Sequence, residues 1–306
     1  MPRKQYPSTN PFRLPLFLLL ALLFSASSTH AQSSPPHLPE KSSPLSRTPL
    51  QWVSAAAALE LPMVRLENPY LRYHMLYQGN KGIELRDEIE SRDGMVARLI
   101  ALNGQPLTPE KDAAERARLQ YLLDNPQDFY DHHKTDQDGK NLAVELIQQL
   151  PHAMFFTYAA DQTPAGHFPG SQVVIDFTPD PAFKPKTTKG EALRGLAGRI
   201  WIETNTGHMV RMHATIIKDT NIGWGILARI YKGGVLDLEQ TDTGHNHRWV
   251  FSRLDEHITV RALLVKTINV NVKLQSSGYQ PIQSLRFQDA IHILLDTPLP
   301  THCPCN

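Results

Sequence analysis

The chain has 306 residues, with 31 Lys and Arg against 30 Asp and Glu, and 41% of its residues are apolar. This near-neutral balance excludes a nucleic-acid or membrane-surface binder that is driven by bulk charge. The ordinary apolar content excludes collagen-like and fully disordered chains.

The N-terminus has the pattern of a secretory signal peptide. Arg3, Lys4 and Arg13 form a basic start, and residues 14–24 form an apolar run that ends before a small-residue cleavage pattern at Ala31. A membrane-spanning helix needs roughly 20 apolar residues, so this run is too short to be a typical membrane-spanning helix. We expect residues 1–31 to be cleaved near Ala31 and the product to be periplasmic or secreted. An uncleaved anchor is the alternative.

Residues 32–49 contain five Pro and five Ser, which predicts a linker before one domain at 50–290 and a C-terminal tail at 291–306. The two cysteines, Cys303 and Cys305, both lie in that tail. A disulfide across one Pro would be strained. The pair is therefore interpreted either as a redox or metal-binding tail or as two incidental thiols.

Helices and strands follow one another in a recognisable order. Residues 52–60 favour a helix, and a strand follows whose apolar Ile83, Leu85 and Ile89 alternate with charged residues on a solvent-facing side. An Asp-Gly turn predicts a hairpin with a second strand at 95–102. A helical insertion at about 108–150 then begins with Thr108 as N-cap and contains two helices, the second from about residue 141.

The second half of the chain predicts consecutive antiparallel strands. They are expected at 152–158, 172–177, 198–203, 208–218, 235–241, 247–254 and 259–274. The predicted fold class is mainly β with helices (α+β).

The last of these segments carries the longest regular pattern. Even positions from Ile258 to Leu274 are apolar and odd positions are mostly polar, which predicts one strand longer than 50 Å at roughly 3.4 Å per residue. Strands of that length belong to large curved sheets. Lys266 interrupts the apolar phase. Either its ammonium faces a cavity and meets a ligand's acidic group, or it marks a bulge or a buried stem with an exposed tip.

A second apolar segment, residues 222–234, is bracketed by glycines. Read as a short helix, it gives one apolar face, and it is interpreted as a lid over the sheet, as a membrane-touching loop or as a plug that completes the core. The candidate ligand-binding residues from both features are Trp224, Ile226, Leu227, Ile230, Tyr231, Leu264, Lys266 and Ile268.

No catalytic constellation stands out, and we predict no catalytic residues, metal or cofactor. Residues 223–228 match a dinucleotide fingerprint loosely, but the flanking segments are not those of a parallel sheet. His245 and His247 could present two imidazoles on one side of an extended segment, although the sequence offers no third ligand. They are more typical of a polar hairpin tip.

With these pieces in place, the chain resembles exported proteins of the outer-membrane lipoprotein-sorting and carrier type, the LolA/LolB/RseB-like half-barrel group. The residues that carry the resemblance are Glu90-Ser91-x-Asp93-Gly94, Asn103-Gly104-Gln105-Pro106-Leu107-Thr108, Gly223-Trp224-Gly225-Ile226-Leu227, Tyr231-Lys232-Gly233-Gly234 with Leu238-Glu239-Gln240, and Ala262-Leu263-Leu264-Val265-Lys266-Thr267-Ile268. The resemblance implies a strongly curved antiparallel half-barrel sheet, of roughly ten strands, with helices over an apolar concave face.

Two functional hypotheses follow, and a third has less support. The leading one is a non-enzymatic periplasmic carrier that binds a lipid, an acyl chain or another apolar ligand in the half-barrel. The second is an envelope interaction or sensory module that contacts a protein partner through the sheet edge or the Trp224 loop. A metal-dependent hydrolase built on histidines is the third, and no nucleic-acid partner is expected.

Overall fold

The computed structural model describes residues 46–64, 70–80, 82–166, 168, 170–245 and 247–301. The predicted signal peptide, most of the predicted linker and both cysteines lie outside these residues. Within the described residues, no helix is both long and apolar enough to cross a bilayer.

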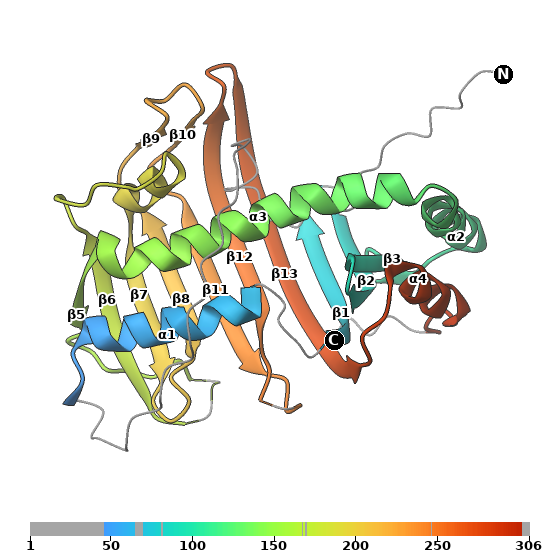
Figure 1. The fold of residues 1–306 in the computed structure, drawn as a ribbon, viewed down its shortest axis with the longest axis horizontal. Coiled ribbons are helices and arrows are strands. Elements are labelled where there is room, and N and C mark those ends of the chain that lie inside the picture. Colours follow the sequence, from blue (N-terminus) through green and yellow to red (C-terminus); the bar gives the residue numbers. More distant parts are fainter. Residues whose placement is uncertain are drawn as a thin grey trace.

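Thirteen antiparallel strands form one open sheet (Figure 1). In chain order they are β1 (Tyr70–Gly79), β2 (Gly82–Ser91), β3 (Gly94–Leu102), β4 (Gln105–Pro106), β5 (Met154–Tyr158), β6 (Gln172–Pro179), β7 (Leu196–Glu203), β8 (Met209–Ile216), β9 (Thr220–Ile222), β10 (Ala228–Ile230), β11 (Val235–Asp242), β12 (Trp249–Ala262) and β13 (Lys266–Ile282). The spatial order is β4-β3-β2-β1-β13-β12-β11-β8-β7-β6-β5, and β9 and β10 form a hairpin that pairs with β12. The first and last strands in the sequence are neighbours in the sheet, because β1 pairs with β13.

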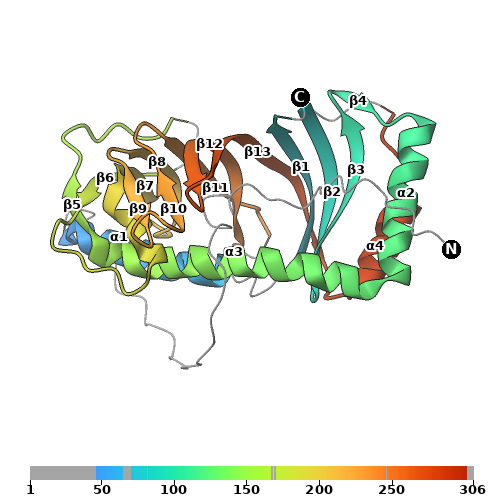
Figure 2. The same cartoon turned by 90° about the horizontal axis from the view of Figure 1, so that it is seen from above.

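Helices cover both faces of this sheet. They are α1 (Pro49–Val64), α2 (Pro109–Asp124), α3 (Pro126–Ala153), the 3-10 helix η3 (Lys189–Gly195) and α4 (Phe287–Asp296). Figure 2 shows α3 running along the sheet from β5 to α2. Trp52 and Ala56 of α1 and Leu146 of α3 pack into the main hydrophobic core with residues of the central strands. A second core lies on the opposite face, between β2, β3, α2 and α4.

The predicted α+β class with an antiparallel sheet is therefore confirmed. The strand number was underestimated, since thirteen strands replace the roughly ten that were expected. The half-barrel shape stays a prediction. The hairpin of β2 and β3 is as predicted, because Ser91 pairs with Gly94 across a two-residue turn.

The first helix of the predicted helical insertion begins where the sequence predicted, after Thr108. The Thr108 side chain accepts a hydrogen bond from the backbone N–H of Lys111, as an N-cap does. The second helix was predicted too short, since α3 begins at Pro126 and not near residue 141. Its buried side there includes Asp136 and Gly139, so the early turns lack the apolar periodicity that identifies a helix.

The single long strand predicted at 258–274 is wrong. The segment is a hairpin in which β12 ends at Ala262, residues 263–265 turn, and β13 begins at Lys266. Val260 pairs with Ile268 and Ile258 with Val270. Since even residues pair with even residues, the apolar phase continues unbroken through the turn and gives the appearance of one strand.

The predicted C-terminal tail at 291–306 begins inside α4. Phe287, Ile291 and Leu294 of this helix are completely buried in the second core. The buried guanidinium of Arg98 on β3 donates to the carbonyl oxygens of Leu294 and Thr297 and thereby holds the end of α4. The globular fold therefore extends past residue 290.

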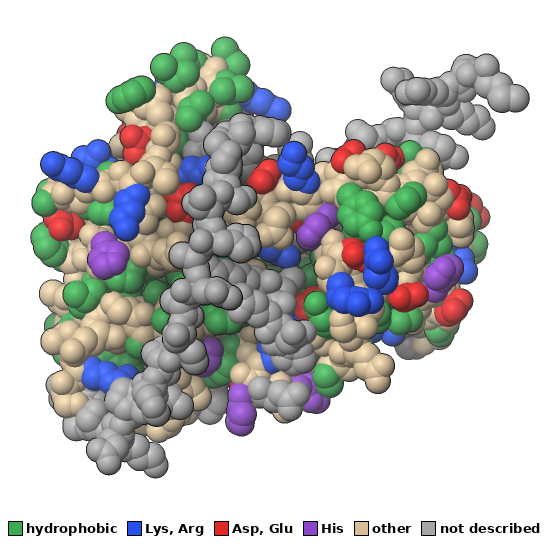
Figure 3. Space-filling model, viewed as in Figure 1, with side chains coloured by type: hydrophobic (Ala, Val, Ile, Leu, Met, Phe, Trp, Pro, Cys, Tyr) green, Lys and Arg blue, Asp and Glu red, His purple; other side chains and the backbone are tan. Residues whose placement is uncertain are grey.

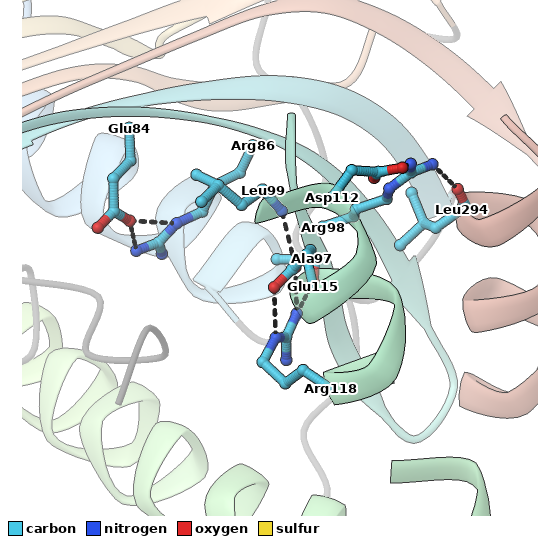
Figure 4. A network of polar contacts seen from close by, with 9 residues as sticks. All are labelled: Glu84, Arg86, Ala97, Arg98, Leu99, Asp112, Glu115, Arg118 and Leu294. Carbon is cyan, nitrogen blue, oxygen red and sulfur yellow. Dashed lines mark hydrogen bonds and ion pairs between the residues drawn. The ribbon is translucent and has the colours of Figure 1, made fainter. Parts of the chain in front are cut away.

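Side chains of α2 cover the edge of β3 beyond its short pairing with β4 (Figure 4). Glu115 accepts from the backbone N–H of Leu99 at 2.9 Å, and Arg118 donates to the carbonyl oxygen of Ala97 at 2.7 Å. Arg118 also forms an ion pair with Glu115. Occupied backbone groups reduce the tendency of a sheet edge to pair with another chain.

Candidate functional site

Two hairpins end side by side at one end of the sheet. The first is β9 and β10, joined by residues 223–227, and the second is β12 and β13, joined by residues 263–265. Strand β10 pairs with β12, and the backbone N–H of Leu263 donates to the carbonyl oxygen of Leu227 at 3.0 Å. The two turns are therefore held together as one projection, which stands above the rest of the sheet in Figure 1.

Five large apolar side chains of these turns face solvent. The exposed fractions are 91% for Trp224, 56% for Ile226, 62% for Leu263, 53% for Leu264 and 86% for Val265. We call these five residues the tip patch. Figure 3 shows hydrophobic side chains gathered at the end of this projection. Contiguous exposed apolar surface of this kind marks an interaction site more often than scattered single residues do.

The backbone of the tip patch is held in an uncommon conformation. Trp224, between Gly223 and Gly225, has a φ of 53°, and Leu263 and Leu264 have φ values of 47° and 63°. This left-handed conformation causes steric strain in bulky residues, whereas Asn or Gly adopts it easily. Turn stability alone would therefore not favour Trp and Leu here, and such strain is concentrated at functional positions.

Next to the two turns, the charged side chains of the hairpins have one sign. Arg229, Arg261 and Lys266 are the charged residues within 220–230 and 260–268, and these stretches contain no Asp or Glu. Lys266, the first residue of β13, is exposed. The ammonium of Lys266 therefore does not face an interior cavity, which corrects one of the interpretations of this residue.

The eight residues predicted to bind a ligand do not line one cavity. Trp224, Ile226 and Leu264 belong to the exposed tip patch, and Lys266 stands beside it. The remaining four lie deeper. Ile230 is buried and Leu227 half-buried in a small core cluster beneath the hairpins, Ile268 packs against the main core, and Tyr231 is half-buried.

The short helix predicted across 222–234 is wrong. Residues 220–222 pair with residues 228–230, so the segment is a β-hairpin. Buried Ile222, Ala228 and Ile230 alternate with outward residues, which fits a strand and leaves no continuous helical face. Trp224 thereby lies in the turn between β9 and β10, where it is exposed and does not form a lid over the sheet.

A second unusual region lies where the first turns of α3 cover β2. The charged side of β2 was predicted to face solvent, but Arg86, Glu88 and Glu90 are buried, and Glu88 is only 2% exposed. Asp136 and Lys140 of α3 interact electrostatically with these carboxylates. We call these five residues the α3 cluster. The prediction failed because α3 supplies a charged covering surface.

Ion pairs and backbone hydrogen bonds stabilise the charges of the α3 cluster. Glu90 accepts from Arg248 at 2.8 Å and from the backbone N–H of Leu71 at 2.9 Å. Burial raises the pKa of Glu88 to about 7, although Arg86 and a hydrogen bond to Tyr73 oppose the shift. Burial likewise raises the pKa of Asp136 to about 6, against the attraction of Lys140. The cluster is thus partly neutral near pH 7.

Two further carboxyl groups are buried apart from these contacts. Glu60 of α1 accepts from Gln240 at 2.6 Å, and burial raises its pKa to about 8. Burial also raises the pKa of Glu256 to about 8. Sequence reasoning missed all of these groups, and the one available signal was the spacing of Asp136 and Lys140, which puts them on one side of a helix.

The histidine pair does not form a metal centre with other described residues. The side chain of His247 is almost fully exposed and lies 3.6 Å from a carboxylate oxygen of Asp242. Among the residues that the structure describes, no group of three or more His, Cys, Asp or Glu is arranged to hold a metal ion. Because β11 ends at Asp242 and β12 begins at Trp249, the pair lies in their connecting loop, as the polar hairpin interpretation predicted.

No family model matches the chain, and no curated protein matches it either. One similar solved structure is the crystal structure of MucB in complex with MucA(peri), which shares 10% sequence identity. The alignment covers 78% of this chain and 100% of that chain, at a TM-score of 0.20. That value is too low to carry an argument about function.

Proposed function

We propose that this protein is a non-enzymatic lipid-binding protein that docks on the surface of a bilayer through the tip patch. The observation that carries the proposal is the exposure of five large apolar side chains on two hydrogen-bonded hairpin turns. The proposal keeps the lipid as the ligand and moves its binding from a cavity to the outside of the sheet.

The internal binding mode is less well supported than the external one. A carrier needs an open apolar face, and the corresponding face of the central strands packs against α1 and α3. Buried residues such as Val270, Val272 and Leu274 of β13 belong to this packed core. Five of the exposed large apolar side chains in the described residues are instead gathered at the tip.

A bilayer suits the shape and composition of the tip better than a protein groove does. The tip projects outward, and Trp is enriched where proteins meet the membrane–water interface. Cations behind apolar side chains match the order of layers in a membrane, with anionic headgroups outside the acyl chains. Arg229, Arg261 and Lys266 stand in that position.

The expected energy is sufficient for reversible docking. Full burial of one large apolar side chain is worth about 2 kcal/mol, and a tenfold change in affinity corresponds to about 1.4 kcal/mol. Loss of Trp224 or Val265 should therefore weaken binding roughly 30-fold each. The strands beneath are already ordered, so little additional ordering opposes docking.

Flotation with lipid vesicles tests this function. Wild-type protein should float with vesicles of phosphatidylcholine and phosphatidylglycerol, and the variant Trp224→Ser with Val265→Ser should remain in the unbound fraction. Phe155→Ser is the matched control, because Phe155 is also apolar and 56% exposed but lies on β5, away from the tip. It should float like the wild type.

Failure of the wild-type protein to bind vesicles of any composition would overturn the proposal. If in-cell cross-linking from the tip then gave one stable protein complex, the alternative function as an envelope interaction module would take its place. Export to the periplasm or outside the cell is a separate proposal that rests on residues 1–31. Cell fractionation with N-terminal sequencing of the product tests it.

A further inference from the structure

Two arginines stand directly opposite each other behind the tip patch. Arg229 of β10 and Arg261 of β12 are Cα partners in the antiparallel pairing of these strands. Like charges in this arrangement repel and destabilise a sheet. Their side chains point away from the small core, since the alternating residues Ala228, Ile230 and Val260 are the buried ones.

The local contacts of the pair leave binding capacity unused. Arg229 donates to Asp219 at 2.6 Å, and its guanidinium lies 5.5 Å from the ring centre of Tyr231. The Nε atoms of both Arg229 and Arg261 are buried, so an outside ligand would be bound by the terminal guanidinium nitrogens. The Arg229 side chain is 36% exposed and Arg261 is half-buried, and two adjacent guanidinium groups are suited to bind the oxygens of a phosphate.

The position of the pair matches the depth of lipid headgroups. Arg261 precedes Leu263 by two residues, and Arg229 follows Leu227 by two. At roughly 3.4 Å per strand residue, both arginines start about 7 Å behind the turns. An interfacial protein segment inserts its apolar side about 5–10 Å into the boundary between headgroups and acyl chains. The arginines would then reach the headgroups while the tip patch contacts acyl chains.

Resting on the function proposed above, we infer that Arg229 and Arg261 form a binding site for the phosphate of anionic lipid headgroups and give the tip its preference among bilayers. The apolar tip provides docking on any fluid bilayer, and the arginine pair adds selection for negative charge. A cation near an anionic membrane surface strengthens binding about fivefold, so the pair should contribute about 25-fold.

Vesicles of two compositions test the inference. Wild-type protein should bind vesicles that contain phosphatidylglycerol more tightly than pure phosphatidylcholine vesicles, and added salt should reduce the difference. The double variant Arg229→Gln with Arg261→Gln should lose about 25-fold on the anionic vesicles and keep its binding to the zwitterionic ones. Arg253→Gln is the matched control, because Arg253 is an exposed arginine of β12 distant from the turn. It should keep the full preference.

Further variants separate a phosphate site from bulk attraction or misfolding. Arg229→Lys with Arg261→Lys keeps the charge but loses the forked donors, so it should recover only part of the preference. Asp219→Asn removes the counterion of Arg229 without removing an arginine, and it should strengthen anionic binding. If it instead weakens binding while the protein melts at the wild-type temperature, the inference fails.

The outcomes distinguish the two proposals. Equal, salt-insensitive binding to both vesicle types would overturn the headgroup site and leave the docking function standing. Absence of binding to both types would end the docking function itself. Inorganic phosphate, added at matched ionic strength, should leave the binding unchanged, and strong competition by it would show that the pair is a site for free phosphate.

Discussion

The tip patch and the α3 cluster depart from ordinary protein surfaces in opposite directions. One exposes five apolar side chains to water. The other buries Arg86, Glu88 and Glu90 beneath α3, whose Asp136 is buried and whose Lys140 is half-buried. Both arrangements carry a free-energy penalty unless something compensates for it. In the α3 cluster Glu90 is compensated, because Arg248 and the backbone of Leu71 bind it.

Among the described residues, nothing covers the apolar side chains of the tip patch in this way. These side chains would leave water only when a partner covers them. The comparison therefore assigns different roles to the two regions. Changes in the α3 cluster should alter the stability of the fold and leave vesicle binding unchanged, and changes in the tip patch should do the reverse.

The largest effect is expected from Glu90→Ala. Arg248 would remain buried without its carboxylate, and an arginine cannot lose its charge, so the free energy of unfolding should fall by about 3–5 kcal/mol. Urea denaturation measures this. Asp138→Ala, which removes an exposed acid of α3, should change it by less than about 0.5 kcal/mol.

Arg248→Met provides the converse test. Glu90 could then take up a proton, so the loss of stability should be smaller than for Glu90→Ala below neutral pH. Folded samples of all three variants should bind vesicles like the wild type. Loss of vesicle binding by a well-folded variant would contradict the division of roles between the two regions.

Stability should also depend on pH in a direction set by the buried carboxyls. The pKa of Glu88 is raised from 4.5 to about 7 and that of Asp136 from 3.8 to about 6. Between the ordinary and the raised pKa of each group, the folded state therefore binds more protons than the unfolded state. The free energy of unfolding consequently falls as pH rises from about 4 to 7. Glu60 and Glu256, raised to about 8, extend the fall upward.

Glu88→Gln sharpens this prediction. An uncharged amide removes the desolvation of a carboxylate, so the variant should lose the part of the pH slope due to Glu88, on the order of 3 kcal/mol across the interval. Thermal melts of the wild type and the variant at pH 4.5 and at about pH 8 measure it. Parallel pH profiles for the two proteins would show that Glu88 ionises normally.

The sequence was informative where its pattern had one physical cause. Alternation between apolar and polar residues identified most strands, and Thr108 with Pro109 identified the start of α2. The turn at 263–265 was missed for a physical reason. The turn consists of Leu263, Leu264 and Val265 and contains none of the Gly, Asn or Pro residues that signal a turn. Even-numbered residues of β12 pair with even-numbered residues of β13, so the apolar alternation continues although the chain reverses its direction.

The predicted ligand-binding residues include Trp224, Ile226 and Leu264 of the tip patch, but not Leu263 and Val265. Glycines around Trp224 drew attention to this segment, but the same glycines permit both a capped helix and a hairpin. The α3 cluster was not predicted, because Glu88 was assigned to the solvent-facing side of a strand and Asp136 lay before the predicted start of the second helix. Two polar surfaces that cover each other leave no apolar signal in either segment.

The smallest predicted effect tests whether residues of the tip patch lower the stability of the fold while they strengthen vesicle binding. Asn and Gly adopt positive φ readily, so Leu263→Asn with Leu264→Gly should stabilise the protein by about 1 kcal/mol. The same variant should bind vesicles at least tenfold more weakly, because it removes two apolar side chains of the tip patch. Thermal melting and vesicle flotation measure the two effects.

The control Phe155→Asn changes an exposed apolar residue on β5, where the backbone has no positive φ. It should neither stabilise the protein nor weaken vesicle binding. A destabilised Leu263→Asn, Leu264→Gly protein would mean that these leucines serve the fold, and the contrast between the two regions would then disappear.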